Sequence, residues 1–238
     1  MIQGVTEKEQ RIRELFAHVA PRYDLVNALM TFGRHRAWKR QAARLSGLKT
    51  GDCALDIGCG TGDLMLAASE TVGRKGLTVG VDICEPMLVA AIKRHPELRG
   101  RMVLARAEAL PFRDGCAGAA LTGFTLRNVS DVRAAISDMA RVVRPGGKVV
   151  LLETSSPTCR LIRPFWCLYM THIVPLLARL LGAPGDAYDY FQRSVREFKP
   201  HEELAEDMRT SGLADAEIHE LALGAVCVHV GTRQCPKA

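Results

Sequence analysis

The densest chemical signal in the sequence is a glycine-rich turn between two acids. Gly58, Gly60 and Gly62 alternate along the turn, with Asp56 before them and Asp63 after them. Glycine permits positive φ and places no side chain in the path of a ligand that lies on the backbone. Apolar runs precede and follow the turn, as is typical of a buried strand that passes directly into a helix. The pattern predicts a nucleotide-like ligand held over the backbone.

Two ligands compete for this turn. A dinucleotide fingerprint, G-x-G-x-x-G, would hold a pyrophosphate at the helix N-terminus. Here the sixth position is Asp63, whose carboxylate would repel a pyrophosphate and compete for the same amide donors. An adenosine-linked amino acid such as S-adenosylmethionine (SAM), with its ammonium, sulfonium and ribose, suits the two acids better. A turn without a ligand is the plain alternative, but three spaced glycines exceed what a tight turn requires. The contacts expected here come from Asp56, Gly58, Gly60, Thr61 and Gly62.

A third acid, Asp82, ends a later apolar stretch, about 20 residues past the turn. An acid in this position can accept hydrogen bonds from both ribose hydroxyls. The alternative is a turn or helix-capping aspartate, because a proline follows closely. Ile83 would supply an apolar wall for an adenine ring. The loop at residues 106–112 would cover the other face of the ring, with Arg106 and Ala107 as the expected contacts.

The elements that position these residues alternate from about residue 52 onward. Strand patterns fall at 53–57, 77–82, 101–105, 117–123, 148–153, 216–221 and 225–233, and helix patterns at 62–72, 86–93, 132–143 and 201–211. This order predicts an α/β fold with a mostly parallel, seven-stranded sheet and an antiparallel C-terminal hairpin turned at Gly224. Ligands of such sheets lie beyond the carboxyl ends of the strands, so one cleft is expected to gather Asp56, Asp82, Glu108 and Glu153.

Two segments lie outside this alternation. Helical spacing before residue 48 predicts an N-terminal helical subdomain (1–48) ahead of the ligand-binding domain (49–238). Within the latter, residues 157–200 are expected to form a helical insertion that covers the cleft, too interrupted by charges and prolines for a transmembrane helix. A helix at residues 36–46 has a basic face, for which we expect solvent and keep a membrane surface as the alternative. That face consists of Arg36, Lys39, Arg40 and Arg44.

The composition limits the class of protein, its cellular location and its partners. Its 238 residues are 47% hydrophobic and 24% charged, as in ordinary globular proteins. No apolar run typical of a signal peptide opens the sequence, and the eight cysteines show no C-x-x-C spacing, so we expect a cytoplasmic protein with reduced thiols and no metal site. The net charge of +6 allows peripheral contact with the inner face of a membrane. We expect no nucleic-acid partner, and a homodimer is left open.

Several motifs carry a resemblance to a known family. Residues 55–63, Asp82 and the loop ending at Phe112 resemble the class I SAM-dependent methyltransferases. A narrower set resembles the quinone-biosynthesis C-methyltransferases, the demethylmenaquinone and ubiquinone methyltransferases: Tyr23-Asp24…Asn27…His35…Trp38, Leu126–Val129, and residues 141–147 followed by Glu153-Thr154-Ser155. The resemblance covers about residues 16–233. It implies a Rossmann-like fold, SAM as cofactor and a prenylated quinol as methyl acceptor.

The sequence departs from the family pattern at three positions of interest. Thr125 stands where a glycine is usual, and Gly123, an expected cofactor contact, stands where a serine is common. Arg106 replaces an Asn or Asp that typically meets the adenine amino group. An arginine cannot accept a hydrogen bond from that amine, so the backbone of Arg106 and Ala107 is expected to serve. These departures are also consistent with another acceptor, such as a phospholipid amine or a specialised aromatic.

The resemblance also implies a mechanism. The sulfonium of SAM already activates the methyl group, so the enzyme mainly aligns donor with acceptor and excludes water. A ring carbon of a hydroquinone becomes nucleophilic when a hydroxyl ionises, which costs about 4 kcal/mol at pH 7 for a phenol pKa near 10. Arg127, with Asn128 beside it, would stabilise the developing phenolate by about 3 kcal/mol. The alternative for Arg127 is a salt bridge to Asp131. The proton would pass to water, to His172 or to His35.

The acceptor pocket is expected to include Tyr23, Asp24 and Asn27, which would otherwise cap the adjoining helix. An apolar set in the insertion would hold the isoprenoid tail or form the core of a lid: Phe165, Trp166, Leu168, Tyr169, Met170, Ile173 and Val174. Two other classes of function are weighed against methyl transfer. Asp63 argues against a nicotinamide-dependent oxidoreductase, and the Arg127-Asn128 pair against a SAM-binding protein without catalysis.

Overall fold

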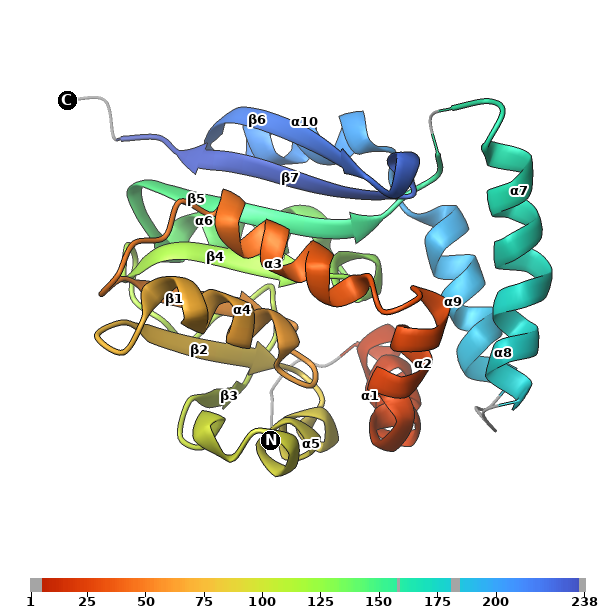
Figure 1. The fold of residues 1–238 in the computed structure, drawn as a ribbon. Coiled ribbons are helices and arrows are strands. Elements are labelled where there is room, and N and C mark those ends of the chain that lie inside the picture. Colours follow the sequence, from red (N-terminus) through yellow and green to blue (C-terminus); the bar gives the residue numbers. More distant parts are fainter. Residues whose placement is uncertain (1–5, 158, 181–184, 236–238) are drawn as a thin grey trace.

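A seven-stranded sheet forms the centre of the computed structural model, which describes residues 6–157, 159–180 and 185–235 (Figure 1). The strand order is β3-β2-β1-β4-β5-β7-β6. The strands are parallel from β3 to β5, and β7 is antiparallel to both β5 and β6, as the sequence predicted. Their bounds are β1 (Cys53–Ile57), β2 (Leu77–Asp82), β3 (Met102–Leu104), β4 (Ala117–Gly123), β5 (Val143–Thr154), β6 (Leu213–Leu221) and β7 (Val226–Arg233).

Helices cover both faces of the sheet. One face carries α3 (His35–Leu45) and α4 (Asp63–Val72), and the other carries α6 (Val132–Val142) and α10 (His201–Thr210). Side chains alternate along β1: Leu55 and Ile57 join the core beneath α6, whereas Ala54 joins the core beneath α3 and α4. Asp56 shares the face of Ala54, so its carboxylate is directed toward α3 and α4.

Further helices gather beyond the carboxyl ends of the parallel strands (Figure 1). They are α1 (Glu7–Val19), a 3-10 turn (Ala20–Arg22), α2 (Tyr23–Met30), α7 (Arg163–Leu168), a π-helical turn (Tyr169–Ile173), α8 (Val174–Leu180) and α9 (Gly185–Glu197). The remaining long helix, α5 (Glu85–Arg94), contacts α1 as well as β2 and β3. No helix in the described ranges is long and apolar enough to cross a membrane.

Two sequence predictions about these elements need correction. Strand β5 begins at Val143, before the Pro-Gly-Gly stretch, because Val143 pairs with Ala117 and regular pairing resumes only at Lys148 with Ala119. The basic face expected on α3 is interrupted, since Lys39 is buried with its Nζ 3.3 Å from Asp63 Oδ2. The other three basic side chains of that face are exposed.

Candidate active site

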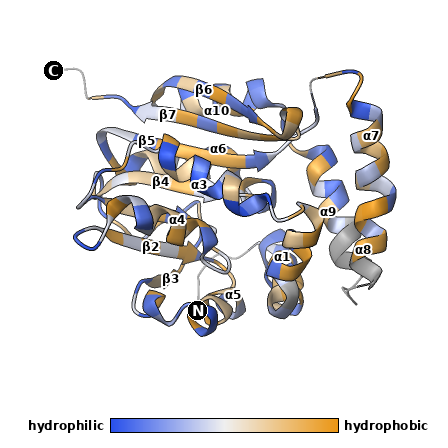
Figure 2. Cartoon of the chain, in the orientation of Figure 1, coloured by the Kyte–Doolittle hydropathy of each residue, from blue (hydrophilic) through white to orange (hydrophobic). Residues whose placement is uncertain are grey.

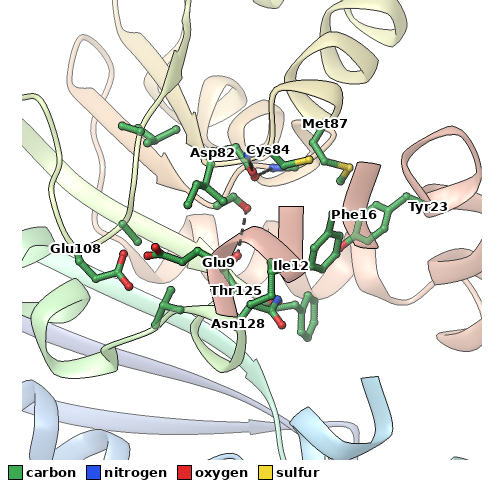
Figure 3. Close-up of a pocket in the computed structure, with 18 residues that line it drawn as sticks. Glu9, Ile12, Phe16, Tyr23, Asp82, Cys84, Met87, Glu108, Thr125 and Asn128 are labelled. Carbon is green, nitrogen blue, oxygen red and sulfur yellow. Dashed lines mark hydrogen bonds between the residues drawn. The ribbon is translucent and has the colours of Figure 1, made fainter. Parts of the chain in front are cut away.

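Two cavities lie beyond the carboxyl ends of the central strands. The first, here the acidic cavity, contains three carboxylates, from Glu9, Asp82 and Glu108 (Figure 3). The second, here the aromatic cavity, has a volume of about 250 Å³ and is bordered by Tyr23, Trp38, Phe124, Trp166, Tyr169 and Phe191 among others. The strand order reverses between β1 and β4, because β2 and β3 lie on one side of β1 and β4 and β5 on the other. Parallel α/β sheets bind their ligands in the crevice at such a reversal.

The glycine-rich turn forms one wall of the acidic cavity. Gly58 has a φ of +69°, and a Cβ atom there would lie 2.2 Å from the Thr125 side chain, so only glycine fits. The N–H of Gly60 donates to Asp82 Oδ2 at 2.8 Å, and the N–H of Cys84 donates to Asp82 Oδ1 at 2.8 Å. Burial raises the pKa of Asp82, while these backbone hydrogen bonds oppose the rise. The carboxylate of Asp82 is thereby fixed at the end of β2.

The chemistry of the acidic cavity fits an adenosine. Its apolar walls include Ile12 and Phe16 of α1 and Met87 of α5 (Figure 3), and Ile83 also lines it. None of the described residues that line it is basic, so nothing there would neutralise a pyrophosphate. Carboxylates that accept hydrogen bonds and flat apolar walls suit ribose hydroxyls and a purine.

Five of the residues predicted to bind the cofactor line the acidic cavity: Gly58, Gly60, Asp82, Ile83 and Ala107. The other five predicted residues do not line the cavity. Thr61 Oγ1 donates to Asp24 Oδ1 at 2.7 Å, and Gly62 caps α4. Gly123 adjoins the Leu64 side chain.

Asp56 and Arg106 complete that second group. Asp56 is buried on the α3–α4 side of β1, and burial raises its pKa to about 7 despite the opposing charge of Lys39. The Nε of Arg106 lies 2.9 Å from Glu9 Oε1, and only its neighbour Ala107 reaches the cavity.

The carboxylate of Asp63 does not face a ligand, as the sequence had suggested, but pairs with side chains of α3. Its Oδ2 lies 3.3 Å from Lys39 Nζ and 3.6 Å from His35 Nε2. Burial would raise the pKa of Asp63, but the nearby His35 ring and the charge of Lys39 outweigh it and hold that pKa well below its usual range. The Asp63 carboxylate is therefore paired with two side chains of α3 and does not itself repel a pyrophosphate, contrary to the expectation from the sequence. A dinucleotide is excluded instead by the acidic cavity, whose described lining residues include no basic side chain.

The aromatic cavity gathers most of the predicted acceptor residues. Tyr23, Asn27 and Arg127 line it, together with Trp166, Tyr169, Met170 and Val174 of the insertion. Asp24 does not, because it pairs with Arg94 and accepts the Thr61 hydroxyl. Asn128 faces the acidic cavity instead. His172 is exposed on the π-helical turn and borders neither cavity.

Arg127 is held in the wall of the aromatic cavity by a buried acid. Its Nη1 lies 2.5 Å from Glu153 Oε1, and its guanidinium carbon lies 5.4 Å from the centroid of the Phe191 ring. The salt bridge to Asp131 considered from the sequence is not the one formed, since Asp131 caps α6 by accepting from Ala134 N. Within the described part of the chain, Arg127 Nε is buried without a hydrogen-bond partner. A fixed cation therefore borders this cavity, and one of its donors has no hydrogen-bond partner among the described residues.

The two cavities share a wall. Tyr23 and Phe124 line both of them, and the consecutive residues Arg127 and Asn128 face one cavity each. Phe124 has a left-handed backbone, with φ +60°, at the end of β4. The two cavities thus adjoin at Tyr23 and Phe124, an arrangement that suits the transfer of a small group between two ligands.

Comparison with known proteins decides the family. The ubiE/COQ5 methyltransferase family matches residues 4–233. The chain belongs to this family. The resemblance found in the sequence is confirmed, and this ubiE/COQ5 methyltransferase uses SAM as its cofactor.

Individual relatives agree with this assignment. A demethylmenaquinone methyltransferase of Roseiflexus castenholzii is 40% identical over 228 residues, 96% of this chain and 95% of the relative. One of Bacillus cereus is 35% identical over 229 residues, 95% of this chain and 97% of the relative. A solved SAM-dependent methyltransferase of Thermotoga maritima, described as a possible histamine N-methyltransferase, shares the fold with a TM-score of 0.63 at 21% identity and covers 93% of this chain and 99% of its own.

The sequence did not single out several side chains of the site. Glu9 carries a signal that could have been used, because Thr6 and Glu9 have the spacing of a helix-capping box. Glu153 was expected in the cleft as an acid at a strand end, but not as the partner of Arg127. Phe124 and the Lys39–Asp63 pair have no local signature.

Proposed function

We propose that this methyltransferase transfers a methyl group from SAM to a ring carbon of a prenylated quinol, with demethylmenaquinol as the first candidate acceptor. One observation carries the proposal: a cavity suited to adenosine and an aromatic cavity meet at Tyr23 and Phe124, with a buried cation, Arg127, on the acceptor side. The similarity to demethylmenaquinone methyltransferases over nearly the whole chain supports the choice of acceptor.

The acidic cavity is assigned to the cofactor. Asp82 accepts hydrogen bonds from the ribose hydroxyls, and Ile83 and Ile12 flank the adenine. The backbone of Gly58 and Gly60 borders the other end of the cavity, where no Cβ atom obstructs a ligand. When bound there, SAM supplies an activated methyl group.

The aromatic cavity is assigned to the quinol ring. The Arg127 guanidinium donates a hydrogen bond to the ring oxygen that ionises, and its Nε is free of other hydrogen-bond partners among the described residues. Ionisation of a phenol costs about 4 kcal/mol at pH 7, and a positioned donor in a water-poor site offsets about 3 kcal/mol of that. Glu153 keeps the guanidinium in place.

The proton balance needs an acceptor other than Arg127, which stays protonated. His35 is not proposed, because its Nδ1 lies 2.9 Å from Thr31 Oγ1 and its Nε2 faces Asp63. His172 is not proposed either, since it borders neither cavity. Water at the mouth of the aromatic cavity takes the phenolic proton. After methylation the ring carbon loses its proton to water and the phenolate oxygen takes one back, so one proton is released for each methyl group transferred.

Exposed apolar side chains surround the insertion helices on the outer side of the aromatic cavity. Leu161 is 81% exposed and Phe165 73%, and Leu168 of α7 and Leu176 of α8 are exposed as well. Figure 2 shows hydrophobic residues along α7. Exposed Arg160 and Arg163 lie beside Leu161 in the sequence. We propose that this face rests on an anionic membrane surface, so that an isoprenoid tail passes from the bilayer to the ring site.

The N-terminal helices and the insertion form a lid in this proposal. Helix α1 lines the acidic cavity, α2 lines both cavities, and the insertion lines the aromatic one.

The proposal is tested by the choice of acceptor. Purified enzyme is incubated in lipid micelles with SAM and, separately, with demethylmenaquinol, the ubiquinone-precursor quinol or phosphatidylethanolamine. We expect turnover with demethylmenaquinol at least tenfold faster than with the amine. Transfer to the amine but to neither quinol would overturn the proposal.

A further inference from the structure

The acidic cavity contains a carboxylate contributed by the N-terminal helix. Glu9 stands in the first turn of α1 and is only 3% exposed (Figure 3). Its Oε2 accepts a hydrogen bond from the Thr6 N–H at 2.7 Å, and the Thr6 hydroxyl accepts from the Glu9 N–H at 3.2 Å. This capping box fixes both the start of the helix and the direction of the Glu9 side chain.

A loop residue on the opposite side holds the other oxygen of Glu9. The Nε of Arg106 lies 2.9 Å from Glu9 Oε1, and Arg106 directly precedes Ala107 in the cavity wall. A guanidinium donates hydrogen bonds but accepts none. Arg106 therefore cannot bind a ligand amine itself, but it orients a carboxylate that can.

The remaining acid of this part of the cavity, Glu108, is held through one of its oxygens by backbone N–H groups. Glu108 Oε1 accepts hydrogen bonds from the backbone N–H groups of Ser130, at 2.9 Å, and Asp131, at 3.3 Å. Its Oε2 lies 3.8 Å from Arg106 Nε. Among the described residues, Glu9 Oε1 has an ion pair but no hydrogen-bond donor, and Glu9 is the more buried of the two glutamates.

The position of Glu9 relative to Asp82 indicates what it binds. A nucleoside whose ribose is held by Asp82 extends its base along the apolar walls formed by Ile83, Ala105 and Ala107. Apart from the two glutamates, the walls there offer mainly apolar atoms. Adenine carries an exocyclic amine, a donor that a carboxylate accepts, whereas a 6-oxo purine presents an oxygen that a carboxylate repels.

We propose that Glu9 accepts a hydrogen bond from the adenine amino group of the cofactor, and that Arg106 is its positioning residue. The base is then recognised by α1 rather than by the side chain of the loop that follows β3. This inference rests on SAM as the cofactor and does not depend on the identity of the methyl acceptor.

Calorimetric titration with two nucleosides tests the proposal without any methyl transfer. S-adenosylhomocysteine and its 6-oxo analogue, S-inosylhomocysteine, are titrated into the full-length chain. We expect the wild type to prefer the adenosine ligand, and Glu9→Gln and Glu9→Ala to lower that preference by on the order of tenfold or more, as expected for a hydrogen bond to a charged group. Arg106→Ala should lower the preference in the same direction but less.

A matched control separates recognition from helix capping. Thr6→Ala removes the hydroxyl half of the capping box but keeps the Thr6 N–H that holds Glu9 Oε2, and it changes no residue that lines the cavity, so it should leave the preference ratio unchanged. The proposal would be overturned if the Glu9 variants kept the wild-type ratio of affinities for the two ligands, whether both affinities fell equally or neither changed. The near-isosteric Glu9→Gln keeps the test valid where Glu9→Ala destabilises α1. A wild type that binds neither ligand would contradict the cofactor assignment, whereas wild-type binding with no change in ratio contradicts only the role of Glu9.

Discussion

Removal of the charge on Arg127 should slow methyl transfer about a hundredfold without loss of cofactor affinity. The guanidinium is proposed to stabilise the quinol phenolate by about 3 kcal/mol, and each 1.36 kcal/mol changes the rate tenfold. Arg127 lines the aromatic cavity and not the acidic one, so the dissociation constant for S-adenosylhomocysteine should change by less than about threefold.

The choice of variant matters because Glu153 is buried. Arg127→Ala alone would leave the Glu153 carboxylate buried and unpaired, at a cost of about 3–5 kcal/mol in stability. The double variant Arg127→Gln/Glu153→Gln removes both charges and keeps two groups that can hydrogen-bond. It should fold with stability closer to that of the wild type and still show the loss of turnover.

The pH dependence of turnover gives a signature that a purely structural role would not produce. Without the guanidinium, the phenol must ionise unassisted, so turnover of the double variant should keep rising toward pH 10. Turnover of the wild type should level off about two pH units lower, because 3 kcal/mol corresponds to about two units of pKa. The assay is initial-rate methyl transfer from labelled SAM to demethylmenaquinol in micelles between pH 6 and 10. Near-wild-type turnover of the double variant, or a parallel pH profile, would refute the role of Arg127.

Three further changes test other parts of the site. Asp82→Ala removes the proposed ribose acceptor and should weaken S-adenosylhomocysteine binding at least about tenfold by calorimetry; unchanged affinity would contradict the ribose role. Asp56 has a folded-state pKa of about 7 against about 3.9 in the unfolded chain, so its ionisation costs stability as pH rises from 4 through 7, by up to about 4 kcal/mol. Urea unfolding of Asp56→Asn should therefore show a gain over the wild type at pH 8 and little at pH 4, and equal differences at both would contradict the buried carboxylate. Leu161→Ser/Phe165→Ser should reduce sedimentation with anionic vesicles while leaving S-adenosylhomocysteine binding unchanged; undiminished sedimentation would exclude this face as the membrane contact.

Most of the sheet could be predicted because its strands are short apolar runs bounded by turn residues. The bounds of β1, β2 and β4 in the structure are those given by the sequence pattern. The predicted start of a strand was wrong where pairing with a neighbouring strand outweighs the local sequence pattern. Strand β5 begins earlier than expected because Val143 finds a partner in Ala117, across a register shift that no local signal reveals.

The site was predictable where a residue's role follows from its own position in an element. Gly58, Gly60 and Asp82 follow from the glycine turn and the strand end, and they line the acidic cavity. The alternation of side chains along β1 also directs Asp56 to the opposite face from Leu55 and Ile57, a distinction that the expectation of one acidic cleft had overlooked.

Pairings between distant residues account for most of what the sequence could not reveal. Glu9 lies on the N-terminal helix and Arg106 in a loop far from it in the sequence, and the fold brings the two together. Arg127 meets Glu153 only because β4 pairs with β5. Such contacts depend on how the layers pack and not on local spacing. The same holds for Asp63, whose charge is neutralised by side chains of α3.

The position of the transferred methyl group tests the proposed reaction most directly. The enzyme is incubated with demethylmenaquinol in micelles and with SAM that carries a carbon-13 methyl group, and the product is analysed by carbon-13 NMR. We predict a labelled methyl group bonded to a carbon of the quinol ring, formed in equal amount to S-adenosylhomocysteine. Label on an oxygen or nitrogen atom, or no label in the quinol while the enzyme binds the cofactor, would contradict C-methylation of a prenylated quinol.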